Sequence, residues 1–197
     1  MHVGRPSDAA DMDILARSGP RCMLGRARRL GGARVIYVSV EATVKRRPEV
    51  VWDVLSDVAS ATAWIEGLVA VEPDDDDARP GVGYTMNVVR RDGARSVAAS
   101  SEITAWRERS LLAIETRAGG MLFFDRVTLA PVDAASTRLG VYGEIVFGSR
   151  IAELFARPHG LLGAVADPWT ERVQAVYQRS VDALVKRIES TSERPYR

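Results

Sequence analysis

The chain has few of the side chains that usually hold metals or act as nucleophiles. It has 197 residues and one cysteine, Cys22, so no disulfide can form within the chain, and a free thiol fits a reducing compartment. The two histidines, His2 and His159, do not give the Cys/His spacing of a zinc site. A Ser-His-Asp triad would depend on His159, and the chain has no G-x-S-x-G elbow. We therefore expect no metal ion and no triad hydrolase.

Charge and apolar runs are also limited. The 27 Lys and Arg residues nearly balance the 26 Asp and Glu residues, giving a net charge of +1. This balance offers no electrostatic basis for binding nucleic acid. No apolar run approaches the roughly 20 residues that a spanning helix needs. We expect a cytoplasmic protein, a monomer or homodimer, with no nucleic-acid partner and no membrane span.

Nucleotide-binding motifs are missing as well. The chain has no GxxxxGK[ST] phosphate loop. The segment Gly81–Met86 reads GVGYTM, which lacks the third glycine of a dinucleotide fingerprint. That segment also leads into an expected strand, whereas the fingerprint must open a helix. We therefore expect no cofactor.

The length suggests one domain with additional residues at both ends. Residues 1–33 lack the apolar stretch that is typical of a secretory signal, and they include a basic cluster beside Gly31 and Gly32. This extension is expected to be flexible, or to result from an upstream start codon; alternatively it covers a cavity or contacts a partner. The domain is expected over residues 34–190, followed by a polar tail at residues 191–197.

The first half of the domain begins with a strand and two short helices. Val35–Val44 alternates apolar and polar residues, which is typical of a half-buried strand. Pro48 suits the first position of a helix, and valines then recur every four residues along one helical face. A second short helix is expected over Thr62–Ile65 and a strand over Gly67–Glu72. The acidic run Asp74–Asp77 reads as a solvated loop.

Five strands and a long helix follow. The strands are expected over Tyr84–Arg91, Val97–Trp106, Leu111–Thr116, Met121–Ala130 and Leu139–Phe147. Asp92-Gly93 is a strong two-residue hairpin signal, and short turns between consecutive strands predict an antiparallel sheet. From Trp169 one apolar stripe predicts a helix packed on that sheet, with Trp169, Val173, Val176 and Leu184 buried. Truncating Val173 to Ala is expected to cost ~2 kcal/mol.

This order of elements resembles the START-like, or helix-grip, superfamily, and within it the polyketide cyclase/dehydrase-type proteins. The resemblance covers roughly Val35–Ser190. It rests on PEVVWDVLSDV after the first strand, on GVGYTM after the acidic loop, and on FFDRVTLAPV and STRLGVYGEIVF. It implies an α+β fold in which a curved antiparallel sheet of six or seven strands wraps around a long C-terminal helix. Two short helices would follow the first strand, and an apolar cavity would lie between sheet and helix.

The resemblance also implies a function class. The protein is expected to bind a hydrophobic small molecule, foremost as a cofactor-independent polyketide cyclase or aromatase, a lyase-type enzyme of antibiotic biosynthesis. The alternative is a non-catalytic carrier of a lipid, quinone or hydrophobic metabolite. A third possibility is a protein-binding module with a filled core and an exposed apolar patch. The fold alone does not choose among them.

Asp125 is the leading candidate for catalysis. It alternates with Phe123, Val127 and Leu129 on one strand, so it should share their inward face. Burial would raise the pKa of this carboxyl group and suit it to proton transfer on an enolisable ketone. Alternatively, Asp125 pairs with an arginine at the sheet surface.

Two further side chains are candidates for catalysis on the strand after the acidic loop. If Tyr84 and Arg90 face inward, Arg90 could polarise a carbonyl group and Tyr84 could donate to an oxyanion. The alternatives are a structural tyrosine and a solvated hairpin arginine. The candidate ligand contacts are Trp64, Met86, Phe123, Val141, His159, Trp169 and Val173. Among these, Trp64 is equally explained by core packing, and His159 by exposure in a loop.

Overall fold

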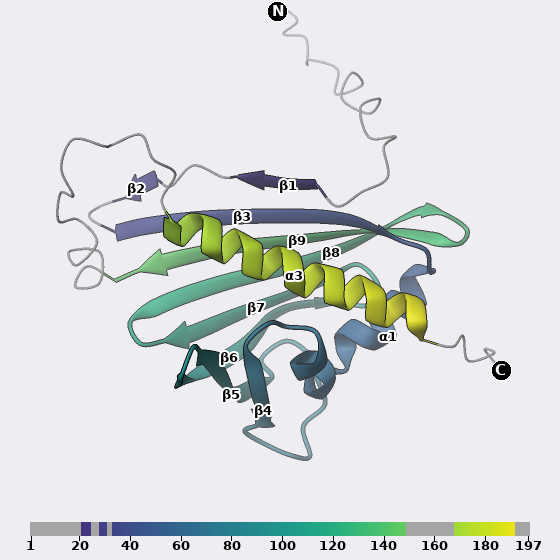
Figure 1. Ribbon diagram of the computed structural model, residues 1–197. Helices are drawn as coiled ribbons and strands as arrows, with labels where there is room; N and C mark the ends of the chain where they lie inside the picture. Colours follow the sequence, from purple (N-terminus) through teal and green to yellow (C-terminus); the bar gives the residue numbers. More distant parts are fainter. Residues whose placement is uncertain (1–20, 25–27, 31–32, 149–167, 192–197) are drawn as a thin grey trace, which may run out of the picture.

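The chain folds into a curved antiparallel sheet whose concave face is crossed by one long helix, as a computed structural model shows (Figure 1). The structure describes residues 21–24, 28–30, 33–148 and 168–191. The helices are α1 (Pro48–Ser56), the 3-10 helix η1 (Val58–Ala63) and α3 (Pro168–Ser190). The strands are β1 (Arg21–Leu24), β2 (Arg28–Leu30), β3 (Ala33–Val44), β4 (Leu68–Pro73), β5 (Thr85–Asp92), β6 (Arg95–Arg107), β7 (Leu111–Ala118), β8 (Met121–Asp133) and β9 (Ser136–Phe147).

The sheet order is β1-β3-β9-β8-β7-β6-β5-β4, with β2 also paired to β3. Strands β3 to β9 are the seven strands of the helix-grip fold, which confirms the predicted fold class. The short strands β1 and β2 pair with β3 through Arg21↔Glu41 and Arg28↔Val35. Both lie in the segment for which the sequence predicts a flexible extension; the predicted domain limits stay predictions.

Local sequence explains the elements at the start of the domain. Alternate residues of β3, from Ile36 to Val44, are buried on the inner face. Pro48 stands at the first turn of α1, and Trp52 of this helix packs edge-on against Trp106 with ring centroids 4.9 Å apart. The second helix lies earlier than the predicted Thr62–Ile65. The Asp57 carboxylate accepts a hydrogen bond from the Ser60 N–H, so a new turn begins directly after α1.

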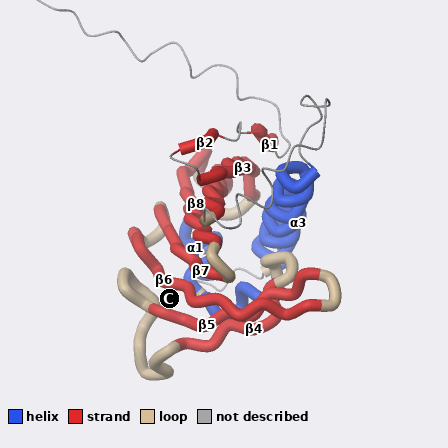
Figure 2. Tube along the Cα trace, turned by 90° about the vertical axis from the view of Figure 1, so that its left-hand side faces the viewer, coloured by secondary structure: helices blue, strands red, loops and turns tan. Residues whose placement is uncertain are grey.

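Helix α3 lies on one side of the curved sheet (Figure 2). Its second half is tightly packed, because Val181, Leu184 and Ile188 are at most 2% exposed. Val173 is partly buried against this core, whereas the side chain of Trp169 lies outside the described residues. Within the part of the chain that the structure describes, no helix is long and apolar enough to cross a membrane.

The C-terminal end of α3 is fastened to the corner between β3 and α1. The Lys45 N–H donates a hydrogen bond to Glu189 Oε1 over 3.0 Å. The Arg46 guanidinium donates to the Glu189 carbonyl oxygen, one of the last carbonyls of the helix, where a cation is favourable. The Arg46 carbonyl in turn accepts from the Thr137 hydroxyl over 2.7 Å. The corner therefore fixes the helix against both β3 and β9.

Truncating Leu184 to Ala should destabilise the protein by about 2–5 kcal/mol, because this fully buried side chain would leave a cavity under α3. Lys186→Ala on the exposed side of the same helix is the control and should change the free energy of unfolding by less than about 0.5 kcal/mol. Urea unfolding measures both values. Equal effects of the two substitutions would contradict the placement of α3.

Candidate functional site: a cavity under the long helix

A cavity of about 140 Å³ lies between the middle of α3 and the concave face of the sheet. Val176, Tyr177 and Ser180 of α3 line it from one side, and residues of β4 to β9 line it from the other. Side chains of α1, η1 and the loop before β4 complete the wall. Most of the lining residues are apolar, so the interior favours an apolar ligand.

Three polar side chains from three elements meet in this apolar space: Asp125 of β8, Tyr177 of α3 and Arg90 of β5. The Tyr177 hydroxyl donates a hydrogen bond to Asp125 Oδ1. Arg90 interacts electrostatically with both partners, and no ion pair joins it to Asp125 among the described side chains. Asp125 is thus held by a phenol inside the cavity, and the surface ion pair considered as its alternative is not formed.

Burial decides the protonation of this group. Desolvation raises the pKa of the Asp125 carboxyl group above its ordinary value, while the Tyr177 hydrogen bond and the Arg90 charge oppose the rise. Desolvation, and then the adjacent carboxylate, raise the pKa of the Tyr177 phenol well above its ordinary value. The phenol therefore stays protonated, and Asp125 is the member of the pair that can lose its proton.

Gly143 makes room for the Tyr177 ring. It lies directly opposite Asp125 in the β8–β9 register. A Cβ atom at this position would lie 2.6 Å from Cζ and 2.7 Å from Cε1 of Tyr177, closer than non-bonded carbon atoms approach. The absence of a side chain at Gly143 thus lets the phenol reach the neighbouring carboxylate.

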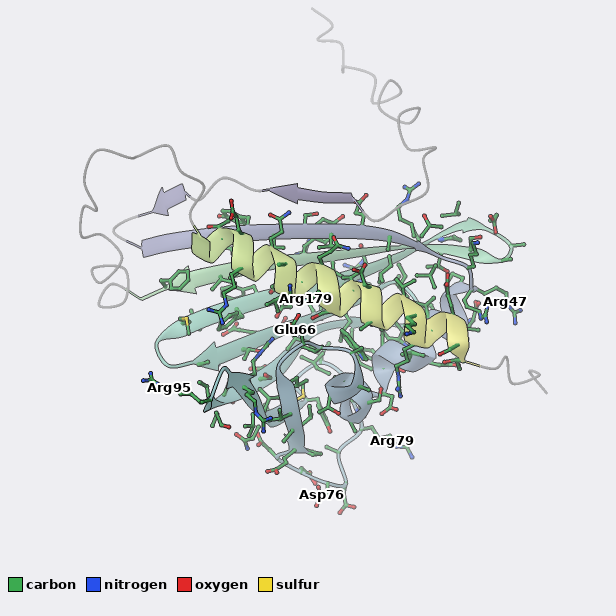
Figure 3. The ribbon with its side chains drawn as sticks, viewed as in Figure 1. Arg47, Glu66, Asp76, Arg79, Arg95 and Arg179 are labelled. Atoms are coloured by element: carbon green, nitrogen blue, oxygen red, sulfur yellow. The ribbon has the colours of Figure 1, made fainter. Side chains whose placement is uncertain are left out.

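Arg90 connects the cavity to the loop between η1 and β4. Its Nη2 donates to the Glu66 carbonyl oxygen over 3.3 Å. The Glu66 N–H donates to Ser180 Oγ over 3.0 Å, and the Glu66 carboxylate pairs with Arg179. Figure 3 shows Glu66 and Arg179 side by side between α3 and this loop. The loop is therefore attached to α3 at a wall of the cavity.

A second polar contact lies on β6 and β7. Ser101 and Thr116 are both buried, line the cavity, and share a hydrogen bond of 2.8 Å between their hydroxyl groups. Because each hydroxyl has a donor and acceptor capacity, the pair can present either kind of group to a ligand.

The convex face of the same strands carries a wider hollow of about 530 Å³. Tyr37, Phe124, Arg126 and Tyr142 line this hollow and not the cavity, whereas Ile114 and Asp125 line both. The Tyr142 hydroxyl donates to Glu41 Oε1 over 3.1 Å. This outer tyrosine–carboxylate pair is a useful comparison for the inner pair of Tyr177 and Asp125.

The structure brings about half of the predicted site residues to the cavity. Those that line it are Trp64, Met86, Arg90, Asp125 and Val141. Arg90 thus points inward rather than lying past the sheet edge. No group of three or more potential metal ligands occurs in the described ranges.

The other predicted residues lie elsewhere. Tyr84 is buried where β5 begins, and the cavity starts two residues further along that face, at Met86. Phe123 and Val173 pack against the core beside the cavity without lining it. The phenol next to Asp125 therefore belongs to Tyr177 and not to Tyr84. His159 and the Trp169 side chain lie outside the described residues.

Sequence reasoning missed Tyr177 and Gly143 as parts of the site. Tyr177 lies within the helix predicted from Trp169, and a tyrosine there carries a polar group that needs a partner when buried. Gly143 stands inside a strand pattern, where glycine marks a bulge or a close approach. Together, these two signals could have indicated that a side chain packs closely over β9.

The raised pKa of Asp125 predicts how stability depends on pH. The pKa of Asp125 is lower in the unfolded chain than in the folded protein. The folded state is therefore progressively destabilised relative to the unfolded state as pH rises from about 4 through the folded-state pKa. Asp125→Asn should therefore melt at a higher temperature than the natural protein at pH 8, and the gain should disappear near pH 3. Differential scanning calorimetry across this range measures the effect.

Asp133→Asn is the control with the opposite sign. Hydrogen bonds from Ala135 and Ser136 lower the pKa of the exposed Asp133. The ionised Asp133 therefore stabilises the folded protein at pH values above its unfolded-state pKa, and this stabilisation is lost as pH falls through its folded-state pKa. Asp133→Asn should lower the melting temperature slightly at pH 8. An Asp125→Asn variant that follows this same direction would contradict the burial of Asp125.

Gly143→Ala should destabilise the protein by about 1–3 kcal/mol, because the added methyl group overlaps the Tyr177 ring. The same substitution in a Tyr177→Ala background should cost far less, since the overlapping ring is gone. Urea unfolding of the two single variants and the double variant gives the coupling energy. An equal cost of Gly143→Ala in both backgrounds would show that the two residues do not touch.

Solved structures with the same architecture come from several bacteria. A Streptomyces protein described as an aromatase/cyclase is 18% identical over 79% of this chain and 94% of its own, with a TM-score of 0.53. A Rhodobacter sphaeroides protein is 13% identical over 87% and 100% of the two chains, with a TM-score of 0.58. A Thermus thermophilus protein is 14% identical over 80% and 99%, with a TM-score of 0.55. At these identities the similarity shows the fold.

Sequence comparisons give the family. A search of curated proteins finds no match. The family model described as "Polyketide cyclase / dehydrase and lipid transport" matches residues 36–189, which include every strand from β4 to β9, most of β3 and nearly all of α3. The chain therefore belongs to the polyketide cyclase/dehydrase and lipid transport family, whose fold binds hydrophobic ligands.

Proposed function

We propose that this protein is a cofactor-independent cyclase that closes and dehydrates a ring from a polyketide-like chain of carbonyl groups. The observation that carries this proposal is the Asp125–Tyr177 pair facing Arg90 inside an otherwise apolar cavity. A cavity that only stored a hydrocarbon would gain nothing from a buried carboxyl group, because burying it costs free energy.

The proposed reaction is an intramolecular aldol condensation. The Asp125 carboxylate removes a proton from a carbon next to a ketone, and the enolate oxygen accepts hydrogen bonds from Arg90. The enolate carbon bonds to a second carbonyl carbon, whose oxygen takes the proton from Asp125. A second α-proton then passes through Asp125 to the departing hydroxide, and water leaves. The steps balance without an oxidant or reductant, so the reaction needs no redox cofactor.

The surrounding residues support the proton transfers. Tyr177 fixes the orientation of the carboxyl group through its hydrogen bond to Oδ1, which leaves Oδ2 for the substrate. The raised pKa brings Asp125 closer to neutral pH, where a general acid–base works best. Apolar walls hold the chain folded, which itself accelerates ring closure.

The biological setting follows from the same proposal. The Streptomyces neighbour is described as an aromatase/cyclase, and we extend that activity to this chain on the basis of the site. The setting would be antibiotic or other secondary metabolism in the cytoplasm.

A carrier of a lipid, quinone or hydrophobic metabolite is the second candidate. The predominance of apolar residues such as Val88, Ile114 and Val141 in the wall favours it. A carrier needs the apolar surface but no titratable group. Three converging polar side chains therefore favour the enzyme.

Asp125→Asn should reduce cyclisation of a reactive poly-β-ketone by ~100-fold or more, the usual scale of a general acid–base contribution. Tyr177→Phe should also slow the reaction, since the carboxyl group loses its orienting donor. Product profiling by liquid chromatography and mass spectrometry, against a reaction without protein, measures both effects.

Tyr142→Phe is the matched control, because it removes a hydroxyl bonded to a carboxylate on the convex face. Its product profile and rate should equal those of the natural protein. If the natural protein leaves the product mixture unchanged, the cyclase proposal fails and the carrier becomes the better interpretation.

A further inference from the structure

The convex face of the sheet carries exposed aromatic side chains near its centre. Phe124 of β8 is 39% exposed and Tyr142 of β9 is 38% exposed, although both lie within long strands. These two side chains and Tyr37 of β3 line the hollow on this face. Aromatic residues are enriched where proteins bind one another, so this surface is a candidate for a protein contact.

Two opposite charges alternate with the exposed rings. In the β8–β9 register, Arg126 lies opposite Tyr142. Glu144 lies opposite Phe124. The four side chains therefore mark the corners of a quadrilateral on the outer face, with the rings on one diagonal and the charges on the other. Within the ranges that the structure describes, no ion pair joins Arg126 or Glu144 to each other or to a third side chain.

This arrangement is complementary to itself under a two-fold axis. When a second copy is turned over along the Phe124–Tyr142 diagonal, each ring meets its own counterpart. Arg126 of each copy then meets Glu144 of the other, which is the reciprocity that a two-fold interface requires. With about 3.3 Å per residue and about 4.8 Å between strands, the strands of the two copies cross at roughly 70°, close to the orthogonal class of sheet packing.

The area of the face sets the strength of such a contact. Strands β3, β8 and β9 have 12 or 13 residues each. From the same spacings, their outer face covers roughly 600 Å² per copy. Two such faces bury about 1,200 Å², the low end for specific complexes, and the curvature of the sheet reduces the area in contact. The surface therefore fits a weak dimer whose population depends on concentration.

The centre of this surface lies directly behind the candidate site. Asp125 and Gly143 face one another in the register, between the four corner residues. Both also line the hollow, and Tyr177 packs on them from the cavity side. A second copy over the hollow therefore excludes water from the reverse side of the strand pair that holds Asp125.

We propose that the outer face of β3, β8 and β9 is the contact surface of a two-fold homodimer, in which Arg126 and Glu144 of the two copies form reciprocal ion pairs. The inference goes beyond the proposed function and does not depend on it. The dimer leaves α3 and the cavity uncovered, because both lie on the concave side of the sheet (Figure 2). Of the two states expected from the sequence, a monomer or a homodimer, it selects the second.

Charge reversal and charge exchange test the proposal by sedimentation velocity, from about 1 µM to about 500 µM protein, the range that a weak complex requires. The natural protein should change from monomer to dimer as its concentration rises. Arg126→Glu should raise the dissociation constant by about 10-fold or more, because two carboxylates then face each other in both symmetry-related contacts. Glu144→Arg should do the same with two guanidinium groups.

The double variant Arg126→Glu/Glu144→Arg exchanges the two charges and should restore the dimer. Lys186→Glu is the matched control, because it reverses an exposed positive charge on α3, on the other side of the sheet, and it should dimerise like the natural protein. The melting temperature of each variant shows whether it is folded.

Restoration by the double exchange supports a direct contact between Arg126 and Glu144 of two copies. A natural protein that stays monomeric at every concentration would overturn the proposal and would leave this face to a different partner. A dimer that tolerates both single reversals uses another surface, which also overturns it. Loss of the dimer in the double variant as well, with all variants folded, would exclude the reciprocal ion pairs.

Discussion

The packing of α3 on the concave face of the sheet determines both the stability and the site of this protein. Over the second half of the helix the contact is complete, with Leu184 and Ile188 fully buried. One to two turns earlier, Val176 and Ser180 face an open cavity instead. The buried second half anchors the helix, and the cavity lies at its middle.

Polar groups in that space are costly, and the chain contains specific features that reduce the cost. Asp125 loses water on folding and gains the Tyr177 hydrogen bond in its place. The bond exists because Gly143 has no side chain where the phenol ring lies. A buried carboxyl group, a phenol on a different element and a glycine between them fit together as one unit. Natural sequences keep such unfavourable groups mainly where function requires them.

The sequence predicts this fold well because its signals are local and periodic. Alternation along β8 placed Asp125 on the inner face, and the valine and leucine stripe placed α3 on the sheet. Contacts between residues that are far apart in the sequence could not be predicted from these local patterns. Whether Arg90 faced inward depended on the curvature of the sheet beyond β5, and the alternation itself allowed both outcomes. Tyr177, the partner of Asp125, lies on a helix 52 positions further along the chain. No local pattern specifies such a contact.

The positions of Arg90 and Asp125 indicate which kind of reaction the site could catalyse. The two groups influence one another electrostatically, yet no ion pair or hydrogen bond joins them among the described side chains. A direct ion pair would satisfy both charges and would fill the polar end of the cavity. In the proposed reaction, a third group would accept a hydrogen bond from Arg90 and exchange a proton with Asp125. A ketone and its enolate do both, because the oxygen accepts hydrogen bonds while the adjacent carbon gains or loses a proton.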